Sequence, residues 1–392
     1  MNEVSLLQQH VQSLLNQLAL LEGWLDHEAI AAQMRRPVRD SFRQEIKQQR
    51  APLEMLALRL PRAGLDMPAS WTTLRQSRAA CQFFFRQYLA MLQGALSRNE
   101  GMDGGLCPVA DALLDEISRR CGLAWDRFTI LADADQFYDL AGIIRLPFPE
   151  TTFWTLPQAA REFGYFAAQE IRGRAAGQTV YHVEAFIRQE AQADQQRIAH
   201  LNDFFADIFA TYTLGPAYAY ATLLLRLDPA DQDTFNHPGS ARRAYVILKT
   251  LDLLGPPQAI LHPFAAVAAW LRDRWRALLQ ATNQPHELPS ANRQQLDNWT
   301  TGFLALLRTH LHDEAAYTGW ARATRLSTVL MSGQPLTTIC QAGDTLTDVL
   351  NAAWRCRLEQ WAQSEAIGLQ SLSACRFLAQ LRQNSQQPAS DH

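Results

Sequence analysis

The stretch Ala160-Arg161-Glu162-Phe163-Gly164-Tyr165-Phe166 is the most informative part of this chain. It lies in a segment whose apolar residues recur with helical spacing, which predicts a helix over about residues 156–172. Positions i and i+4 of a helix share a face, so Arg161 and Tyr165 point to the same side, with Glu162 next to the first of them. The chemistry of this face depends on which residues it packs against.

Two later segments carry polar residues in a comparable way. Asn202-Asp203-Phe204-Phe205-Ala206-Asp207 opens a predicted helix over residues 203–227 and places two carboxylates one turn apart. Asn236-His237-Pro238-Gly239-Ser240-Ala241-Arg242-Arg243 leads into another predicted helix over residues 240–254. The three segments follow one another in a fixed order within about a fifth of the chain.

In this order the three segments resemble the gluzincin metallopeptidases, above all the CAAX prenyl proteases and related bacterial heat-shock proteases. An intact HExxH helix of this kind holds zinc with its two histidines, and the glutamate between them acts as general base. The resemblance, which covers about residues 143–250, implies that Arg161 and Tyr165 stand at the two histidine positions and Glu162 at the base position. It implies that Asp203 stands at the position of the third ligand, usually a glutamate.

The resemblance also implies supporting roles for other residues. Asp207 matches an aspartate that supports the site from behind the ligands. His237 and Arg243 match a T-H-P-x-x-x-x-R element whose histidine and arginine approach the active site. Gly215-Pro216-Ala217-Tyr218 fits a helix break of such relatives, and the short run Ile143, Ile144, Arg145 and Leu146 matches an edge strand that binds a peptide substrate.

The departures from the family pattern fall on the metal ligands themselves. A guanidinium cannot bind a metal, and a tyrosine is a poor zinc ligand near neutral pH. We therefore expect no metal cofactor, and a Glu162 whose general-base position is vestigial. Arg161 can instead pair with Glu162, Asp203 or Asp207 and join the two helices without a metal. The alternatives are an Arg161 on the solvated surface and a Tyr165 that only fills the core.

A second hypothesis keeps the activity. His200, Asp203 and Asp207 share a helical face and could form a relocated zinc site, with Glu162 as the base of an active metal-dependent hydrolase. A third hypothesis is a purely helical interaction protein whose likeness to the metallopeptidases is accidental. Both the pseudoenzyme and the active hydrolase predict that residues 161, 165 and 203 lie close together, whereas an accidental likeness does not. Bound metal is expected for the active hydrolase and not for the pseudoenzyme.

Composition limits the class of protein. The 392 residues are 47% hydrophobic with a net charge of −3, which favours a sizeable core and gives no indication of nucleic-acid binding. None of the six cysteines forms a CxxC pair, so free thiols in a reducing compartment are expected. The start of the chain lacks the pattern of a signal peptide, and the uncharged run 208–225 is interrupted by Gly215-Pro216. These features predict a cytoplasmic protein without membrane insertion.

Helical periodicity dominates the whole chain and predicts a mainly α fold, with a zincin-like helical core and a small β element. The runs 128–131 and 143–146 are the only strands expected. Asp133, Asp135 and Asp139 lack the spacing of a calcium loop and are expected in a solvated turn. The glycine-rich loop 99–107 and later turns suggest an N-terminal helical region, a degenerate zincin-like domain and a C-terminal helical region, with the bounds 1–98, 108–254 and 257–384.

These observations predict a metallopeptidase-like pseudoenzyme. Such a protein would act as a scaffold, a regulator or a subunit that binds a peptide or protein partner. Its oligomeric state and the partner's identity are not encoded in any recognisable motif. Neither a nucleophile elbow nor a phosphate-binding glycine loop occurs in the sequence.

Overall fold

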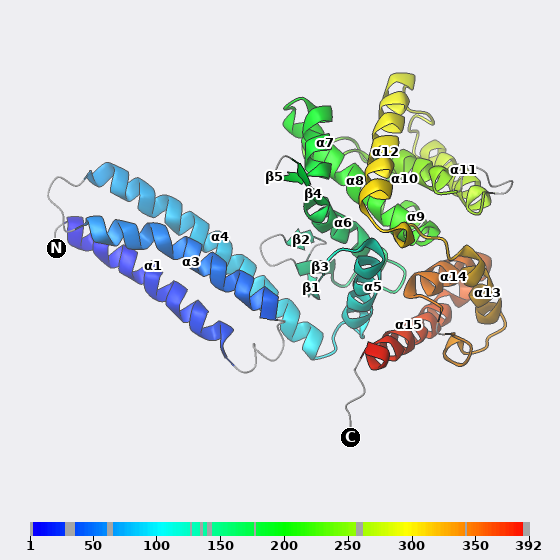
Figure 1. The fold of residues 1–392 in the computed structure, drawn as a ribbon, viewed down its shortest axis with the longest axis horizontal. Coiled ribbons are helices and arrows are strands. Elements are labelled where there is room, and N and C mark those ends of the chain that lie inside the picture. The colour runs from blue at the N-terminus through cyan, green and yellow to red at the C-terminus, as the bar shows by residue number, and fades with distance from the viewer. Residues whose placement is uncertain are drawn as a thin grey trace. The chain divides into compact units, whose positions relative to one another are not determined.

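The computed structural model describes residues 3–27, 36–60, 66–125, 128–133, 136–138, 143–175, 178–255, 262–341 and 343–386. Its fold is mainly helical, as the periodicity predicts (Figure 1). The chain forms two compact units, one of residues 1–107 with 126–148 and one of residues 108–125 with 149–392. This grouping differs from the three regions expected from the sequence, because the strands within residues 126–148 pack with the N-terminal helices.

Three long helices lie side by side in the first unit (Figure 1): α1 (Glu3–Leu25), α3 (Arg36–Arg59) and α4 (Met67–Asn99). The first of them has an apolar stripe that is buried at every turn from Leu7 to Leu25. Phe42, Phe84 and Tyr88 meet this stripe and pack edge to face or tilted against one another. The unit therefore has a hydrophobic core of its own.

A small sheet completes the first unit. Its strands are β1 (Thr129–Ala132), β2 (Gln136–Tyr138) and β3 (Ile143–Pro147), in the order β1-β3-β2. Strand β3 runs parallel to β1 and antiparallel to β2. Gly94 of α4 lies so close to β1 that a Cβ there would stand 2.4 Å from the carbonyl oxygen of Leu131.

The expectation of an accessible peptide-binding edge at Ile143, Ile144, Arg145 and Leu146 is wrong. These residues form the central strand β3, whose two edges are already hydrogen-bonded within the chain. All four side chains are buried, as is usual for a strand covered on both faces. Within the acidic cluster of the neighbouring turn, Asp133 is exposed, and Asp135 and Asp139 lie outside the described residues.

The second unit is built almost entirely of helices, with one β-hairpin. In chain order its elements are α5 (Leu106–Cys121, which begins in the first unit), α6 (Gln158–Glu170), β4 (Arg172–Ala175), β5 (Gln178–Tyr181), α7 (His182–Ala191), α8 (Gln195–Leu214), α9 (Pro216–Leu225), α10 (Ser240–Leu253), α11 (Ala265–Ala281), α12 (Ser290–His310), α13 (Trp320–Met331), α14 (Leu346–Glu359) and α15 (Ser364–Gln386).

Helix α8 is the centre of this unit. Every residue of α8 from Asp203 to Leu214 is buried, because α6, α7, α10 and α12 all pack around it. The helix ends at Gly215, whose φ of 63° is a left-handed value that glycine adopts without strain. Pro216 then begins α9, so the predicted break of a buried helix pair at Gly215-Pro216 is confirmed.

The hairpin β4–β5 was not predicted, and it interrupts a region expected to be helix and loop. The two helices that follow the hairpin are separated by a short break: α7 ends before Gln192 and Ala193, which both have positive φ. Helix α8 starts at Gln195, with the side chain of Asp194 accepting a hydrogen bond from the backbone N–H of Arg197. This division points α7 and α8 in different directions from one tight turn.

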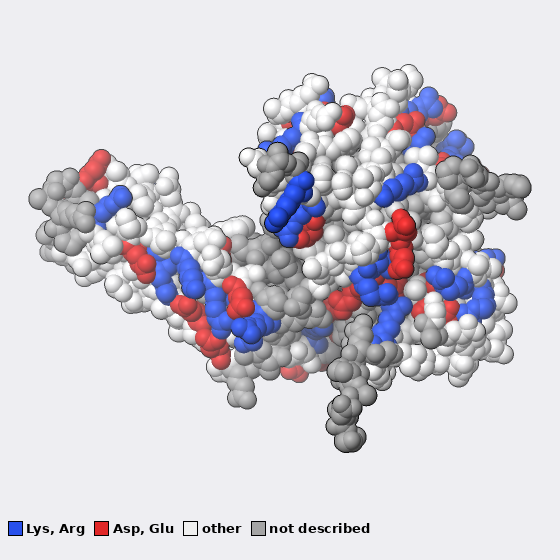
Figure 2. All heavy atoms as spheres, in the orientation of Figure 1, with Lys and Arg blue, Asp and Glu red and all other residues white. Residues whose placement is uncertain are grey.

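Acidic and basic side chains alternate over the described part of the visible face, and neither sign dominates a large area of it (Figure 2). Among the described residues, no helix combines the length and the apolar content that crossing a bilayer requires.

Candidate functional site

Close packing of α6 on α8 brings the polar residues of the two helices together. Gly164 faces Ala206, and a Cβ at Gly164 would lie 2.9 Å from the Cα of Ala206. Two small residues at this crossing let the helix backbones approach, so side chains on either side of the crossing can meet. Residues 161 and 165 of α6 therefore face residues 203 and 207 of α8.

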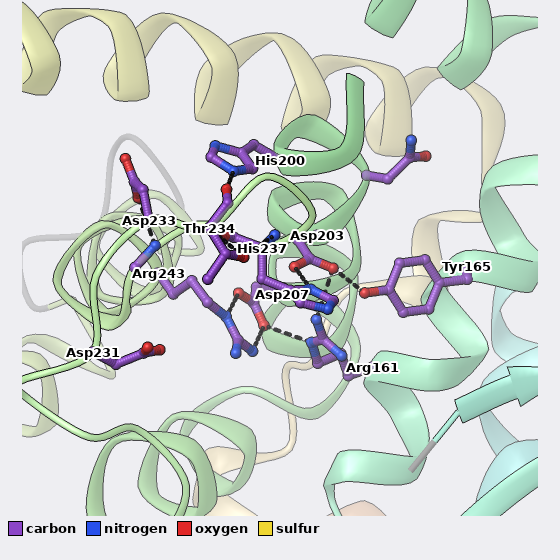
Figure 3. A network of polar contacts seen from close by, with 12 residues as sticks. Arg161, Tyr165, His200, Asp203, Asp207, Asp231, Asp233, Thr234, His237 and Arg243 are labelled. Atoms are coloured by element: carbon purple, nitrogen blue, oxygen red, sulfur yellow. Dashed lines mark hydrogen bonds and ion pairs between the residues drawn. The ribbon is translucent and has the colours of Figure 1, made fainter. Parts of the chain in front are cut away.

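Arg161 lies at the centre of the resulting network (Figure 3). Its Nη1 donates to Glu162 Oε1 at 2.9 Å and its Nη2 donates to Asp203 Oδ1 at 2.9 Å. Its Nε stands 3.3 Å from Asp207 Oδ1. The side chain is only 11% exposed, so the hypothesis of a buried network joining the helices is confirmed, and the alternative of a solvated surface arginine is wrong.

Asp203 accepts hydrogen bonds from both ends of the site (Figure 3). The hydroxyl of Tyr165 donates to Oδ1, the oxygen that also pairs with Arg161. Nδ1 of His237 lies 2.9 Å from Oδ2. Asp203 is 4% exposed and the His237 side chain is 69% exposed, so this contact links the buried network to the surface.

Asp207 is held by a second arginine. Arg243 of α10 donates to both carboxylate oxygens, from Nε at 2.8 Å and from Nη2 at 2.9 Å, which is the bidentate geometry that a guanidinium favours. The hydroxyl of Tyr218 on α9 donates to Oδ1 at 2.5 Å. Asp207 is fully buried, and its two oxygens thus join α6, α8, α9 and α10.

The loop before α10 positions His237. The Oγ1 of Thr234 accepts from the backbone N–H of His237 at 2.9 Å, and the N–H of Thr234 donates to the carbonyl of His237 at 2.8 Å. His200 on α8 contacts the carbonyl oxygen of Thr234 through Nε2 at 2.8 Å and Arg242 through Nδ1 at 3.3 Å. The two ring nitrogens of His200 are therefore directed at this loop and at α10, and not at Asp203.

Burial and charge fix the protonation of the network. Burial alone lowers the pKa of Arg161, but the carboxylates of Asp203, Glu162 and Asp207 around it more than reverse this effect and raise the pKa. Burial first of all raises the pKa of Tyr165 far above its ordinary value, so its hydroxyl remains a donor. Burial also acts to raise the pKa of Asp207, but Arg243 outweighs it and the pKa is lowered.

The charges of the network nearly balance. Three carboxylates (Glu162, Asp203, Asp207) face two guanidiniums (Arg161, Arg243), and the imidazole of His237 contacts Asp203. Each buried charge has an opposite charge within hydrogen-bonding or ion-pair distance. This arrangement offsets the cost of removing five ionic groups from water.

The residues present do not fit a zinc ion. Arg161 brings a permanent positive charge to the first ligand position, and the protonated hydroxyl of Tyr165 donates where a ligand would have to supply a lone pair. His200, Asp203 and Asp207 do not converge, because the histidine turns to Thr234 and the carboxylates pair with guanidiniums. Within the described ranges, no three His, Cys, Asp or Glu side chains are grouped so that they could hold a metal ion.

A large pocket adjoins the network on the side of Tyr165. Its volume is about 950 Å³, and it is enclosed by the C-terminal half of α6, the hairpin β4–β5, α7 and the start of α8. Tyr165, which donates to Asp203, and Asn202, which precedes Asp203 in the chain, both line the pocket. The walls mix apolar residues such as Tyr181, Ile187 and Ile198 with paired charges, among them Glu170 with Arg172 at 3.2 Å.

Sequence reasoning missed two parts of the site. Tyr218 had been noted only as part of a helix break, although a tyrosine in a charge-free buried segment needs a partner for its hydroxyl. The hairpin that walls the pocket was also missed, although Gly177 followed by the β-branched Thr179 and Val180 is a weak signal of a turn and a strand. Compared with protein-family models, with curated proteins and with solved structures, the chain matches none.

Proposed function

We propose that this chain is a non-catalytic protein with a metallopeptidase-like arrangement of α6, α8 and α10, and that it binds a peptide segment of a partner protein. One observation gives the strongest support to the non-catalytic, metallopeptidase-like part of this proposal. The guanidinium of Arg161 lies between Glu162, Asp203 and Asp207, where the resemblance implies a metal ion. An internal cation therefore joins the helices in place of an external one.

The same contacts argue against hydrolysis at this site. A metallopeptidase relies on its metal to activate water and to stabilise the negative charge that develops on the substrate carbonyl. Glu162, at the base position, is 3% exposed and is ion-paired to Arg161 at 2.9 Å. A carboxylate held in this way is a structural partner of the arginine and is poorly placed to take a proton from water.

The pocket beside Tyr165 supports the second half of the proposal. Its volume of about 950 Å³ exceeds what a single side chain fills, and its walls combine apolar surface with Gln169, Gln195 and Asn202 as hydrogen-bonding groups. The hairpin at its rim has strands that, among the described residues, pair only with each other. An extended peptide can pair with such an edge and place a side chain in the pocket next to it.

Selection from a displayed library of random peptides, followed by fluorescence anisotropy with a labelled selected peptide, tests this binding. Gln169 lines the pocket and is exposed, so Gln169→Trp fills the pocket without disturbing the core. We expect this variant to weaken peptide binding at least about tenfold, or about 1.4 kcal/mol. Gln294→Trp, at an exposed position of α12 outside the pocket, is the matched control and should bind normally.

Two results would contradict the proposal. The first is a library from which no peptide is enriched over many rounds on the folded protein. The second is a set of selected peptides that bind both tryptophan variants with the same affinity as the unchanged protein, which would place the binding surface away from this pocket.

A further inference from the structure

A second pocket lies in another part of the same unit, between α10, α11 and the segment that leads into α12. Its volume is about 400 Å³, at the small end of the range typical of ligand pockets, about 300–1,000 Å³. It shares no lining residue with the pocket beside Tyr165 or with the Arg161 network. Its properties are therefore independent of the function proposed above.

The deep part of this pocket is apolar. Leu248 on α10 and Trp275 and Leu279 on α11 line it, and each is no more than 5% exposed. Pro285 and Leu288 close the side that leads to α12. An apolar group of a ligand that enters this space would be removed from water on several sides, which is the main source of affinity in small-molecule sites.

The mouth of the pocket carries an excess of positive charge. Four cations line it, Lys249, Arg272, Arg276 and Arg293, but only two carboxylates do, Asp252 and Glu287. These two carboxylates pair with Arg272 at 2.6 Å and with Arg293 at 3.5 Å.

The other two cations are paired from outside the pocket. The carboxylate of Asp297 lies 3.1 Å from Lys249, and that of Asp273 lies 3.5 Å from Arg276, and neither acid lines the pocket. Side-chain exposures of 30% for Lys249 and 52% for Arg276 leave both cations accessible to a ligand. The wall that a ligand would meet is therefore net positive, although the chain as a whole is slightly acidic.

We infer that this pocket binds an amphipathic organic anion, with its apolar body against Trp275 and its anionic head at Lys249 and Arg276. The apolar floor and the cationic rim are both needed to select such a ligand. An apolar floor alone would accept neutral ligands, and a cationic rim alone would accept any anion. A carboxylic or sulfonic acid with an aromatic or aliphatic body matches both the depth and the charge of the pocket.

The probe for this inference is 8-anilinonaphthalene-1-sulfonate, an aromatic sulfonate whose fluorescence rises when it leaves water. We expect saturable binding of one probe per chain, and displacement by decanoate but not by 1-decanol, both used below the concentration at which they aggregate. A neutral alcohol of the same length has the same apolar body without the charge, so this comparison measures the contribution of the cationic rim alone.

Two charge reversals on one helix locate the site. Arg276→Glu removes a cation of the rim, whereas Arg274→Glu changes an exposed arginine of α11 that does not line the pocket. Both variants change the net charge equally. We expect a rise of at least tenfold in the Kd of the probe for the first and of less than twofold for the second. If Arg276→Glu lowers the thermal midpoint, Arg293→Glu, at a 43% exposed position across the mouth, replaces it.

The inference fails if the two reversals weaken the probe equally, since the effect would then be one of overall charge. It also fails if 1-decanol displaces the probe as well as decanoate does, since the site would then recognise only apolar surface. Binding that does not saturate would show that the probe adheres to the molecular surface at large.

Discussion

At the scale of the residue, Arg161 determines how the buried carboxylates of the site are paired. Arg161 pairs with both Glu162 and Asp203, and it shares Asp207 with Arg243. Removal of one member of a buried ionic network leaves the others uncompensated in a medium of low polarity. The arginine thus holds the carboxylates of α6 and α8 together, which is the role that the proposed function assigns to it.

Replacement of Arg161 should therefore strongly destabilise the folded protein. We expect Arg161→Ala to lower the free energy of unfolding by about 3–5 kcal/mol, since it leaves buried carboxylates without their positive partner. Urea denaturation followed by circular dichroism measures this change. Arg188→Ala is the matched control, because Arg188 pairs with Glu184 at a 73% exposed position, and it should change stability by no more than about 1 kcal/mol. Equal effects of the two substitutions would contradict a buried role for Arg161.

The lowered pKa of Asp207 makes a prediction about acid stability. Burial alone would raise this pKa, and Arg243 more than reverses it, so the folded state holds the proton less tightly than the unfolded state does. The stabilisation is complete above the ordinary carboxyl pKa near 4 and is lost as the pH falls through the lowered value. Thermal midpoints between pH 3 and 7 should fall more steeply for the unchanged protein than for Asp207→Asn, even though the variant is less stable at pH 7. Parallel curves would refute this prediction.

Individual contacts were predictable where the residue types left few options. A buried guanidinium needs carboxylates, and Glu162, Asp203 and Asp207 were the carboxylates at the right spacing. The partners of Tyr218 and His200 were not predictable, because a hydroxyl or an imidazole accepts many partners. The contact of His200 depends on the path of the loop that contains Thr234, and the contact of Tyr218 depends on the packing of α9 against α8. No local pattern specifies either of them.

At the scale of the element, the site exists because α6 and α8 approach closely. Gly164 is costly in a helix, by about 1 kcal/mol relative to alanine, yet it faces Ala206 at the point of contact. The glycine therefore serves the packing of the two helices and not the stability of α6 itself.

A pair of glycine substitutions separates these two effects. Gly164→Ala should lower the free energy of unfolding by about 1–3 kcal/mol, because the new Cβ would stand 2.9 Å from the backbone of Ala206 and force the helices apart. Gly23→Ala in α1, where nothing lies within 4 Å of the new Cβ, should instead raise it by up to about 1 kcal/mol. Denaturant unfolding measures both. A stabilising Gly164→Ala would show that the helices are not in close contact.

Elements with a long apolar period were predictable from the sequence, and short strands were not. The stripe of α1 and the break at Gly215-Pro216 follow from spacing and from backbone chemistry. The run 143–146 was correctly read as a strand, but its continuous burial favours a central position over the edge position that the family resemblance implied. The hairpin β4–β5 has largely exposed residues and hence no alternating pattern to detect.

At the scale of the whole molecule, the mainly helical fold follows from composition and periodicity, while the grouping into units does not. Strand β1 packs on α4 and pairs with β3, and these contacts between distant parts of the sequence assign residues 126–148 to the first unit. Local patterns contain no information about such pairing. The second unit contains both proposed sites, the pocket beside Tyr165 and the pocket at Trp275.

The measurement that tests the proposed metallopeptidase-like arrangement most directly is the zinc content of the variant Arg161→His/Tyr165→His. The two histidines would stand one turn apart on α6 facing Asp203, and loss of the guanidinium would release the carboxylate of Asp203, whereas Asp207 would stay paired with Arg243. Zinc is measured by elemental analysis after dialysis. We expect less than about a tenth of an equivalent of zinc per chain in the unchanged protein and in the control variant Arg161→Ala/Tyr165→Phe. We expect one equivalent per chain in the histidine variant. Stoichiometric zinc in the unchanged protein, or a folded histidine variant with no more zinc than the control, would contradict the proposal.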